Sequence, residues 1–217
     1  MTGVTNFARE LEAKKLDLLR KLIPDLRAIG LLVNPVNPNT FSEVGQMQFL
    51  ASAGGWRLEV IPVRTESELE AAFATMARRR VDAFLLTVDA IFADFGKQIA
   101  ALAVRYALPG VGPLTGGGSV IGYGASNVDA HRQVGVYAGR ILKGEKPADL
   151  PIQRSTRVEL IINLKTARAL GISVPRTVLV RADEVIGIVL PFLQRESLLL
   201  ARLYGPAVRC KRFLRPG

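Results

Sequence analysis

The stretch AIGLLVNPVNPNT, residues 28–40, decides the fold of this chain. Its first half is a short, uninterrupted apolar run, which is typical of a strand buried on both faces in a parallel sheet. Its second half consists mostly of Asn and Pro, which favour turns, and it places Asn39 or Thr40 where either can cap a following helix. A buried strand that leads through a polar loop into a helix is the repeating unit of an α/β protein.

The same order of elements continues on both sides of this stretch. An amphipathic pattern predicts a helix at residues 9–23, and Thr65 with Glu68 has the spacing of a capping box. Alternating strands and helices predict right-handed crossovers, and therefore an α/β fold with three layers around a doubly wound, mostly parallel sheet. Further strands are expected at residues 56–63, 81–89, 119–126 and 158–164, and further helices at 41–53, 66–80, 92–108, 128–147 and 165–171.

The composition excludes several classes of protein. The chain has 217 residues, of which 49% are hydrophobic and 22% are charged, as in an ordinary globular domain. One Cys excludes a disulfide framework and Cys-based zinc sites, and one His excludes multi-histidine metal sites. No apolar run approaches the ~18 residues of a membrane span. The N-terminus becomes charged before an apolar core can form, so it does not resemble a signal peptide.

The net charge of +10 is unevenly distributed. Residues 187–217 hold six basic residues and one acidic residue, and therefore half of the excess. The rest of the chain mixes both signs, as a solvated surface does. Nucleic-acid binding requires clustered basic residues with aromatic side chains for stacking, whereas only 6% of this chain is aromatic. We therefore expect no nucleic-acid partner.

The candidate site follows from the fold, because doubly wound sheets bind ligands at the carboxyl ends of their strands. Asp89 has two open interpretations: a carboxylate that accepts from an ammonium or hydroxyl group, or a cap for the next helix. The glycine run at residues 116–118 is also open, because its amides can bind an anion or its glycines can serve only a hinge. The strand-end candidates are Asn34, Asn37, Thr65, Asp89, Gly116 and Gly117.

No catalytic or cofactor motif accompanies these residues. The chain contains no Walker loop, no complete GxGxxG pattern and no GxSxG elbow. The single histidine, His131, lies close to Asp129 in sequence, but two residues apart on a helix do not face the same side. We therefore expect no cofactor, no metal and no catalytic activity.

Residues 121–186 carry a specific combination of motifs. They include ILKGEKPADLP, a strand ending in INLKTA, ALGISVP and RADEVI, in that order. This combination closely resembles the end of ABC-transporter substrate-binding proteins of the tryptophan/tyrosine-uptake type. The opening VTNFARELEAKKLDLLRKLIP, followed by NPVNP, is similar to the start of their second lobe. The resemblance covers residues 2–186.

The resemblance implies a type I periplasmic binding fold, in which two flavodoxin-like lobes close around a ligand in the cleft between them. It implies a small solute such as an amino acid as ligand, a transporter permease as partner and a periplasmic location. Without a signal peptide, however, the chain as it stands is expected to be cytoplasmic. Tyr123 joins the candidate ligand-binding residues because its strand leads toward the other lobe.

The resemblance also divides the chain. Residues 1–127 and 152–186 are expected to form the second lobe, and residues 128–151 to form a crossing helix of a first lobe that this truncated chain lacks. Residues 187–217 are an atypical basic tail. Without the first lobe, the helix at 128–147 is expected to expose apolar side chains and to promote self-association. These side chains are Val134, Val136, Tyr137, Ile141 and Leu142.

Two other functions compete with solute binding. A small flavodoxin-like α/β enzyme would use Asp89 and the glycine run. A ligand-sensing regulatory domain would require a helix-turn-helix segment, and none is recognisable in the sequence. The motifs at residues 121–186 favour the binding protein.

Overall fold

The computed structural model describes residues 2–6, 9–114, 118–155 and 157–187. The chain divides into two units, Met1–Ile186 and Gly187–Gly217. The helices and strands given below belong to the first unit, and the predicted basic tail at 187–217 lies, apart from its first residue, outside the described residues.

Seven strands form the main sheet, in the order β3-β2-β4-β5-β6-β8-β9. The β6–β8 pair is antiparallel and the other neighbouring pairs are parallel, which confirms the predicted mostly parallel, doubly wound sheet. Two further short strands, β1 and β7, pair in parallel in a small sheet of their own. The strands are β1 (Val4–Asn6), β2 (Ala28–Val33), β3 (Arg57–Pro62), β4 (Ala83–Leu86), β5 (Gly110–Gly112), β6 (Ile121–Ala125), β7 (Gln153–Ser155), β8 (Val158–Asn163) and β9 (Glu184–Ile186).

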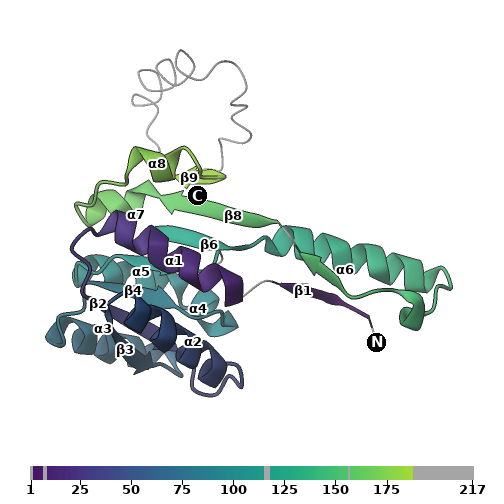
Figure 1. Cartoon of the computed structure of the whole chain (residues 1–217), viewed down its shortest axis with the longest axis horizontal. Coiled ribbons are helices and arrows are strands. Elements are labelled where there is room, and N and C mark those ends of the chain that lie inside the picture. Colours follow the sequence, from purple (N-terminus) through teal and green to yellow (C-terminus); the bar gives the residue numbers. More distant parts are fainter. Residues whose placement is uncertain (1, 7–8, 115–117, 156, 188–217) are drawn as a thin grey trace, which may run out of the picture. The chain divides into compact units, whose positions relative to one another are not determined.

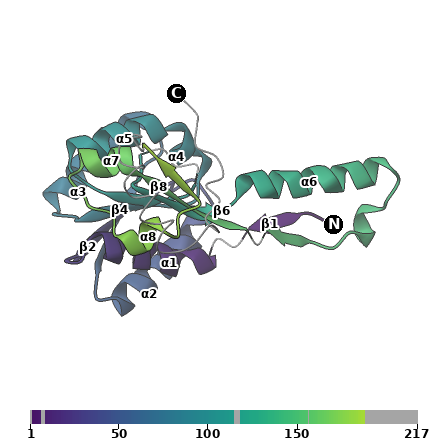
Figure 2. The ribbon, with the colours of Figure 1, turned by 90° about the horizontal axis from the view of Figure 1, so that it is seen from above.

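Helices cover both faces of this sheet (Figures 1 and 2). Strand β2 shows the division, because Ile29, Leu31 and Val33 belong to one apolar core, while Leu32 belongs to another. The first core includes α1 and α2, and the second includes α3 and α5, so successive residues of the strand bury opposite faces. The helices are α1 (Arg9–Leu22), α2 (Thr40–Ala53), α3 (Leu69–Arg78), α4 (Ala90–Asp94), α5 (Gly96–Arg105), α6 (Asn127–Leu142), α7 (Leu164–Ala169) and α8 (Arg176–Leu179).

Two predicted helices have different bounds in the structure. The helix expected at 92–108 is two helices, α4 and α5, because the backbone at Phe95 turns out of helical geometry with ψ of 3°. The helix expected at 128–147 ends at Leu142, and two residues later Gly144 has a φ of 101°, which favours glycine. Residues Pro147–Asp149 form a short 3₁₀ turn instead.

Two predicted helix caps, before α2 and at residue 65, were wrong in detail. Asn39 stands before α2, but its side chain makes no capping hydrogen bond. Thr65 makes none either, and its hydroxyl lies 3.0 Å from the hydroxyl of Ser67. The carboxylate of Glu68 instead accepts a hydrogen bond from the backbone N–H of Arg64, at 2.7 Å. The side chain of Glu68 therefore still accepts from a backbone N–H at the start of this turn, but the donor is Arg64 and not the cap residue Thr65.

Helix α6 lies with β1 and β7, beyond the end of β6 (Figures 1 and 2). The hydroxyl of Tyr137 donates a hydrogen bond to the carbonyl of Pro151, at 2.6 Å, and its side chain is buried. The expectation that Tyr137 is exposed was therefore wrong. Val134, Val136 and Leu142 are exposed as expected. Within the described ranges, no helix combines the length and the apolar character needed to cross a bilayer.

Candidate ligand-binding site

The candidate site lies where the sheet reverses its winding. From β2 the chain moves outward to β3 on one side, and then returns to β4 and continues to β5 on the other. The loops that leave β2 and β4 therefore diverge, and such a switch point is where doubly wound sheets bind ligands. The first loop carries Asn34 and Asn37, and the second carries Asp89.

The carboxylate of Asp89 joins these two loops. Its Oδ2 accepts hydrogen bonds from Nδ2 of Asn34, at 3.0 Å, and from Nδ2 of Asn37, at 2.7 Å. Its Oδ1 accepts from the backbone N–H of Ile91, at 3.0 Å, which caps α4. Both interpretations of Asp89 therefore describe the same side chain: it caps a helix and it stands at the mouth of the crevice.

These hydrogen bonds also fix the charge of Asp89. Partial burial alone would raise its pKa, but the bonds from Asn37, Ile91 and Asn34 outweigh burial and hold the pKa below its usual value. Asp89 is therefore ionised at neutral pH. Each carboxylate oxygen accepts about two hydrogen bonds, so Oδ1 retains room for one more donor.

The two asparagines are themselves held by their own loop. Oδ1 of Asn34 accepts from the N–H of Val36, at 3.1 Å, and Oδ1 of Asn37 accepts from the N–H of Asn39, at 2.9 Å. The hydroxyl of Thr40 donates to the carbonyl of Asn34, at 2.5 Å. Each asparagine amide has a second hydrogen, which donates to no residue in the described part of the chain and is available to a ligand.

Sequence reasoning missed three charged residues beside this cluster. Lys15 of α1 is only 1% exposed, and its Nζ forms an ion pair with Oε1 of Glu12, at 2.7 Å. Burial raises the pKa of Glu43 in α2, and the charges of Glu12 and Asp89 raise it further, whereas Lys15 lowers it. The charges that act on Glu43 are thus two carboxylates and one ammonium group, so the formal charge of these four side chains together is negative.

A sequence signal for this charged group was present. Lys15 stands three residues before Leu18 and seven before Leu22, so it interrupts the apolar stripe of α1. A lysine in a buried stripe requires a carboxylate partner. That requirement points to Glu12 one helical turn away.

The remaining predicted residues lie apart from Asp89 or outside the described chain. Thr65 is exposed, and the described residues place no hydrogen bond between it and the Asp89 cluster. Tyr123 lines a separate cavity between α1, β6, β8 and α8. Gly116 and Gly117 lie outside the described residues. Gly118, the next residue, has a φ of 101°, and a Cβ there would meet the backbone of α5.

Exposed apolar side chains flank the polar cluster. Val36 lies between the two asparagines and Val88 directly precedes Asp89, while Phe41 stands in the first turn of α2. Phe41 is 92% exposed and Val36 is 74% exposed. Large apolar groups exposed next to anchored polar groups are typical of a ligand-binding surface. Among the described residues, no group of His, Cys, Asp and Glu side chains is arranged to hold a metal ion.

Comparison with known proteins gives consistent results. The family model for ABC transporter substrate binding proteins matches residues 1–186. A tyrosine-binding protein of Clostridioides difficile (strain R20291) is 22% identical over 161 residues, which cover 72% of this chain and 46% of that protein. The chain thus spans less than half of this relative.

Solved structures share the fold. An ABC domain from Streptococcus pneumonia, in complex with L-Trp, is 26% identical with a TM-score of 0.74; the match covers 85% of this chain and 64% of that one. A conserved domain protein from Vibrio cholerae is 23% identical with a TM-score of 0.76, over 85% and 62% of the two chains. These likenesses confirm the flavodoxin-like lobe of a type I periplasmic binding fold. From the match over residues 1–186, this chain belongs to the family of ABC transporter substrate binding proteins.

Proposed function

We propose that this chain binds an amino acid at the carboxyl edge of its sheet, as the solute-binding component of an ABC uptake transporter. The observation that carries the proposal is the ionised Asp89, held at the switch point by Asn34 and Asn37 within a cluster of net negative charge. Two findings support an amino acid as the solute: the chain belongs to the substrate-binding family, and two similar proteins are a tyrosine-binding protein and an ABC domain in complex with L-Trp.

The ammonium group of the ligand would bind on the acidic side of the cluster. Oδ1 of Asp89 accepts one more hydrogen bond, and the carboxylate of Glu43 lies close enough for the charge of Asp89 to raise its pKa. A cation placed between these two groups relieves their repulsion, and charge-assisted hydrogen bonds are stronger than neutral ones. An ammonium group is therefore favoured over a neutral donor.

The carboxylate of the ligand would bind the asparagine side. The second amide hydrogens of Asn34 and Asn37 can donate to it, and their loop hydrogen bonds hold both amides in place. The apolar body of the ligand would contact Val36 and Phe41. This arrangement favours an aromatic or branched amino acid.

The open surface of the site sets the expected affinity. Val36 and Phe41 are largely exposed and Asp89 is only partly buried, so each described contact remains accessible to water. Contacts between exposed charges contribute about 0–1 kcal/mol each. We therefore expect the 217-residue chain to bind an amino acid with a Kd of the order of millimolar.

The domain organisation is part of the same proposal. The segment 128–151, which holds most of α6, would belong to the opposite lobe of the family fold. The packing of α6 against β1 and the hydrogen bond from Tyr137 to Pro151 support that assignment. The chain spans 46% of the tyrosine-binding relative. A periplasmic location and a permease partner follow from the family resemblance.

A binding role without catalysis fits the chemistry of the site better than an enzyme does. The single histidine, His131, lies on α6 and not on the loops after β2 and β4. A general base must lie within hydrogen-bond reach of the group it deprotonates. A regulatory domain has weaker support: a LacI family regulator from Bifidobacterium animalis has a TM-score of 0.53 at 11% identity, which is a likeness of fold.

Titration calorimetry with L-tryptophan tests the proposal. Weak, saturable binding is expected in the wild type, and Asp89→Asn should weaken it about threefold to fivefold, because the negative charge at the ammonium position is lost from an open, hydrated contact. Asp94→Asn is the matched control, since Asp94 is exposed at the end of α4. Equal affinities of the two variants, or no binding by the wild type, would refute the proposal.

A further inference from the structure

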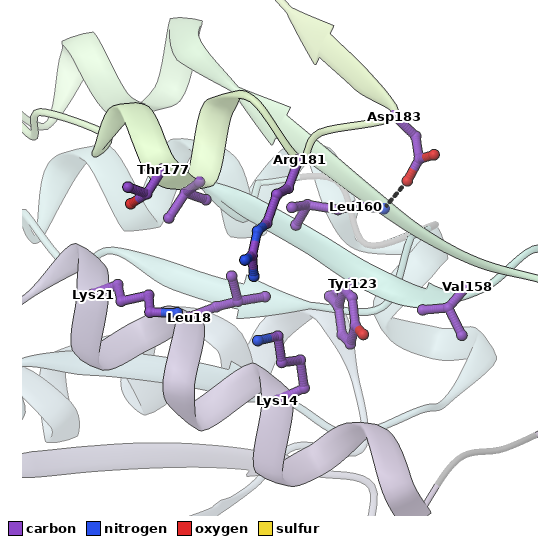
Figure 3. Close-up of a pocket in the computed structure, with 10 residues that line it drawn as sticks. Lys14, Leu18, Lys21, Tyr123, Val158, Leu160, Thr177, Arg181 and Asp183 are labelled. Atoms are coloured by element: carbon purple, nitrogen blue, oxygen red, sulfur yellow. Dashed lines mark hydrogen bonds between the residues drawn. The ribbon is translucent and has the colours of Figure 1, made fainter.

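A second cavity lies on the face of the sheet, away from the switch point. It opens between α1, β6, β8 and α8 and has a volume of about 480 Å³ (Figure 3). This volume is within the range of small-molecule sites. Neither the asparagines nor Asp89 line it, so the proposed amino-acid site leaves it unused.

The floor of the cavity is apolar. Leu18, Leu160 and Val178 are buried beneath it, and Tyr123 and Val158 form its half-buried side. These side chains come from four separate elements of the unit, so the floor is held by the main core and not by a loop. A ligand with an apolar chain or ring would remove this surface from water.

The rim of the cavity is cationic. Lys14 and Lys21 rise from α1, and Arg181 reaches toward them from the residues after α8 (Figure 3). The two lysines share one carboxylate, that of Asp17, at 2.9 Å and 3.0 Å. Asp183 also lines the cavity, but its Oδ2 accepts from the backbone N–H of Leu160, at 2.8 Å.

Arg181 is the group that this arrangement leaves without a partner. Its guanidinium has no hydrogen bond or ion pair to any residue that the structure describes. Three cations therefore converge on one apolar floor, while the nearby carboxylates are already engaged. A guanidinium group binds a carboxylate through two parallel hydrogen bonds, and ammonium groups beside it add further attraction.

We propose that this cavity is a second binding site, specific for an amphiphilic carboxylate: an apolar chain or ring that carries one anionic carboxylate and no ammonium group. The carboxylate pairs with Arg181 between Lys14 and Lys21, and the apolar body lies on the floor beside Tyr123. A free amino acid is disfavoured here, because the three cations outnumber the two carboxylates, Asp17 and Asp183, and repel its ammonium group. The two sites thus differ in the charge that each selects.

Octanoate is the probe that tests this site, with amide NMR spectra of the full chain as the readout. Saturable shifts are expected at the cavity residues Tyr123, Leu160 and Thr177, and not at Asn34 or Asp89. Octylamine and octanol have the same chain without the carboxylate, so both should bind at least about fivefold more weakly. Added salt should weaken octanoate binding, because the cations on the rim are exposed.

A matched pair of variants identifies the anchoring residue. Arg181→Gln should weaken octanoate binding about fivefold to tenfold, while Arg176→Gln, at the exposed start of α8, should leave it unchanged. Absence of saturable octanoate binding, equal binding of octylamine, or equal affinities of the two variants would each overturn the proposal. The amino-acid site is tested by shifts at Asn34 and Asp89, so failure of one site is distinguishable from failure of the other.

Discussion

Replacing Asp89 by Ala removes the contacts that hold the two loops of the candidate site together. The variant loses the cap on α4, which is worth about 1 kcal/mol. It also loses the hydrogen bonds from Asn34 and Asn37, and because the amides can bond to water instead, each contributes only about 0.5 kcal/mol. We expect Asp89→Ala to lower the free energy of unfolding by about 2 kcal/mol in total.

Asp89→Asn should cost about half as much. Asparagine caps a helix as well as aspartate does, but its single acceptor oxygen cannot serve the cap and both asparagines together. Urea unfolding at neutral pH, followed by circular dichroism, measures these differences. Asp94→Ala is the control, and it should leave the free energy of unfolding nearly unchanged because Asp94 is exposed.

The pH dependence of the Asp89→Ala effect provides an independent check. The pKa of Asp89 is lower in the folded chain than its ordinary value of about 3.9. The folded state therefore binds the proton less tightly than the unfolded state, and the stabilisation is fully present above the ordinary pKa and is lost as pH falls through the folded pKa. The difference between wild type and Asp89→Ala should shrink in acid. A difference that stays constant or grows as pH falls would refute the assignment of charge and hydrogen bonds to Asp89.

Three further predictions concern other parts of the chain. Burial raises the pKa of Glu43, and the charge of the neighbouring Glu12 raises it further, so the ionisation of Glu43 opposes folding. Glu43→Gln should therefore raise the thermal midpoint of unfolding at neutral pH but not below about pH 4, and a lower midpoint at neutral pH would contradict this. Leu142 of α6 is 88% exposed, so sedimentation should detect concentration-dependent association that Leu142→Lys reduces, and a wild-type monomer at all concentrations would exclude it. Residues 1–186 form a compact unit, so shortening the chain after Ile186 should shift the thermal midpoint of unfolding by less than about 2 °C. A much lower midpoint would show that residues 187–217 stabilise this unit.

The positions of the longer main strands along the chain were predictable because each of them carried a strong local pattern. The apolar run of β2 is buried at every position, and its polar loop contains both asparagines of the site. The short strands β1, β5, β7 and β9 have three residues each, which is too few for a period to show. Their pairing depends on distant partners that a local pattern does not contain.

The candidate site was predictable only in part, because some of its residues come together through tertiary contacts that a local sequence pattern does not contain. Asn34, Asn37 and Asp89 follow buried strands, so the rule that ligands bind at carboxyl ends found them. Glu43 belongs to the group because α1 brings Glu12 and Lys15 against α2, which is a tertiary contact. Tyr123 was grouped with the asparagines by its strand, but its side chain points to the face of the sheet and lines the second cavity.

Amide NMR spectra of the chain during titration with L-tryptophan show directly whether an amino acid binds at the switch point. Weak, saturable shifts are expected at the loops after β2 and β4, centred on Asn34, Asn37 and Asp89. Indole-3-propionate, which lacks the ammonium group, should bind more weakly and shift these signals less at the same concentration, because the cluster around Asp89 selects a cation. Saturable shifts that are absent from both loops, or equal shifts with indole-3-propionate, would contradict the claim that this edge of the sheet binds an amino acid.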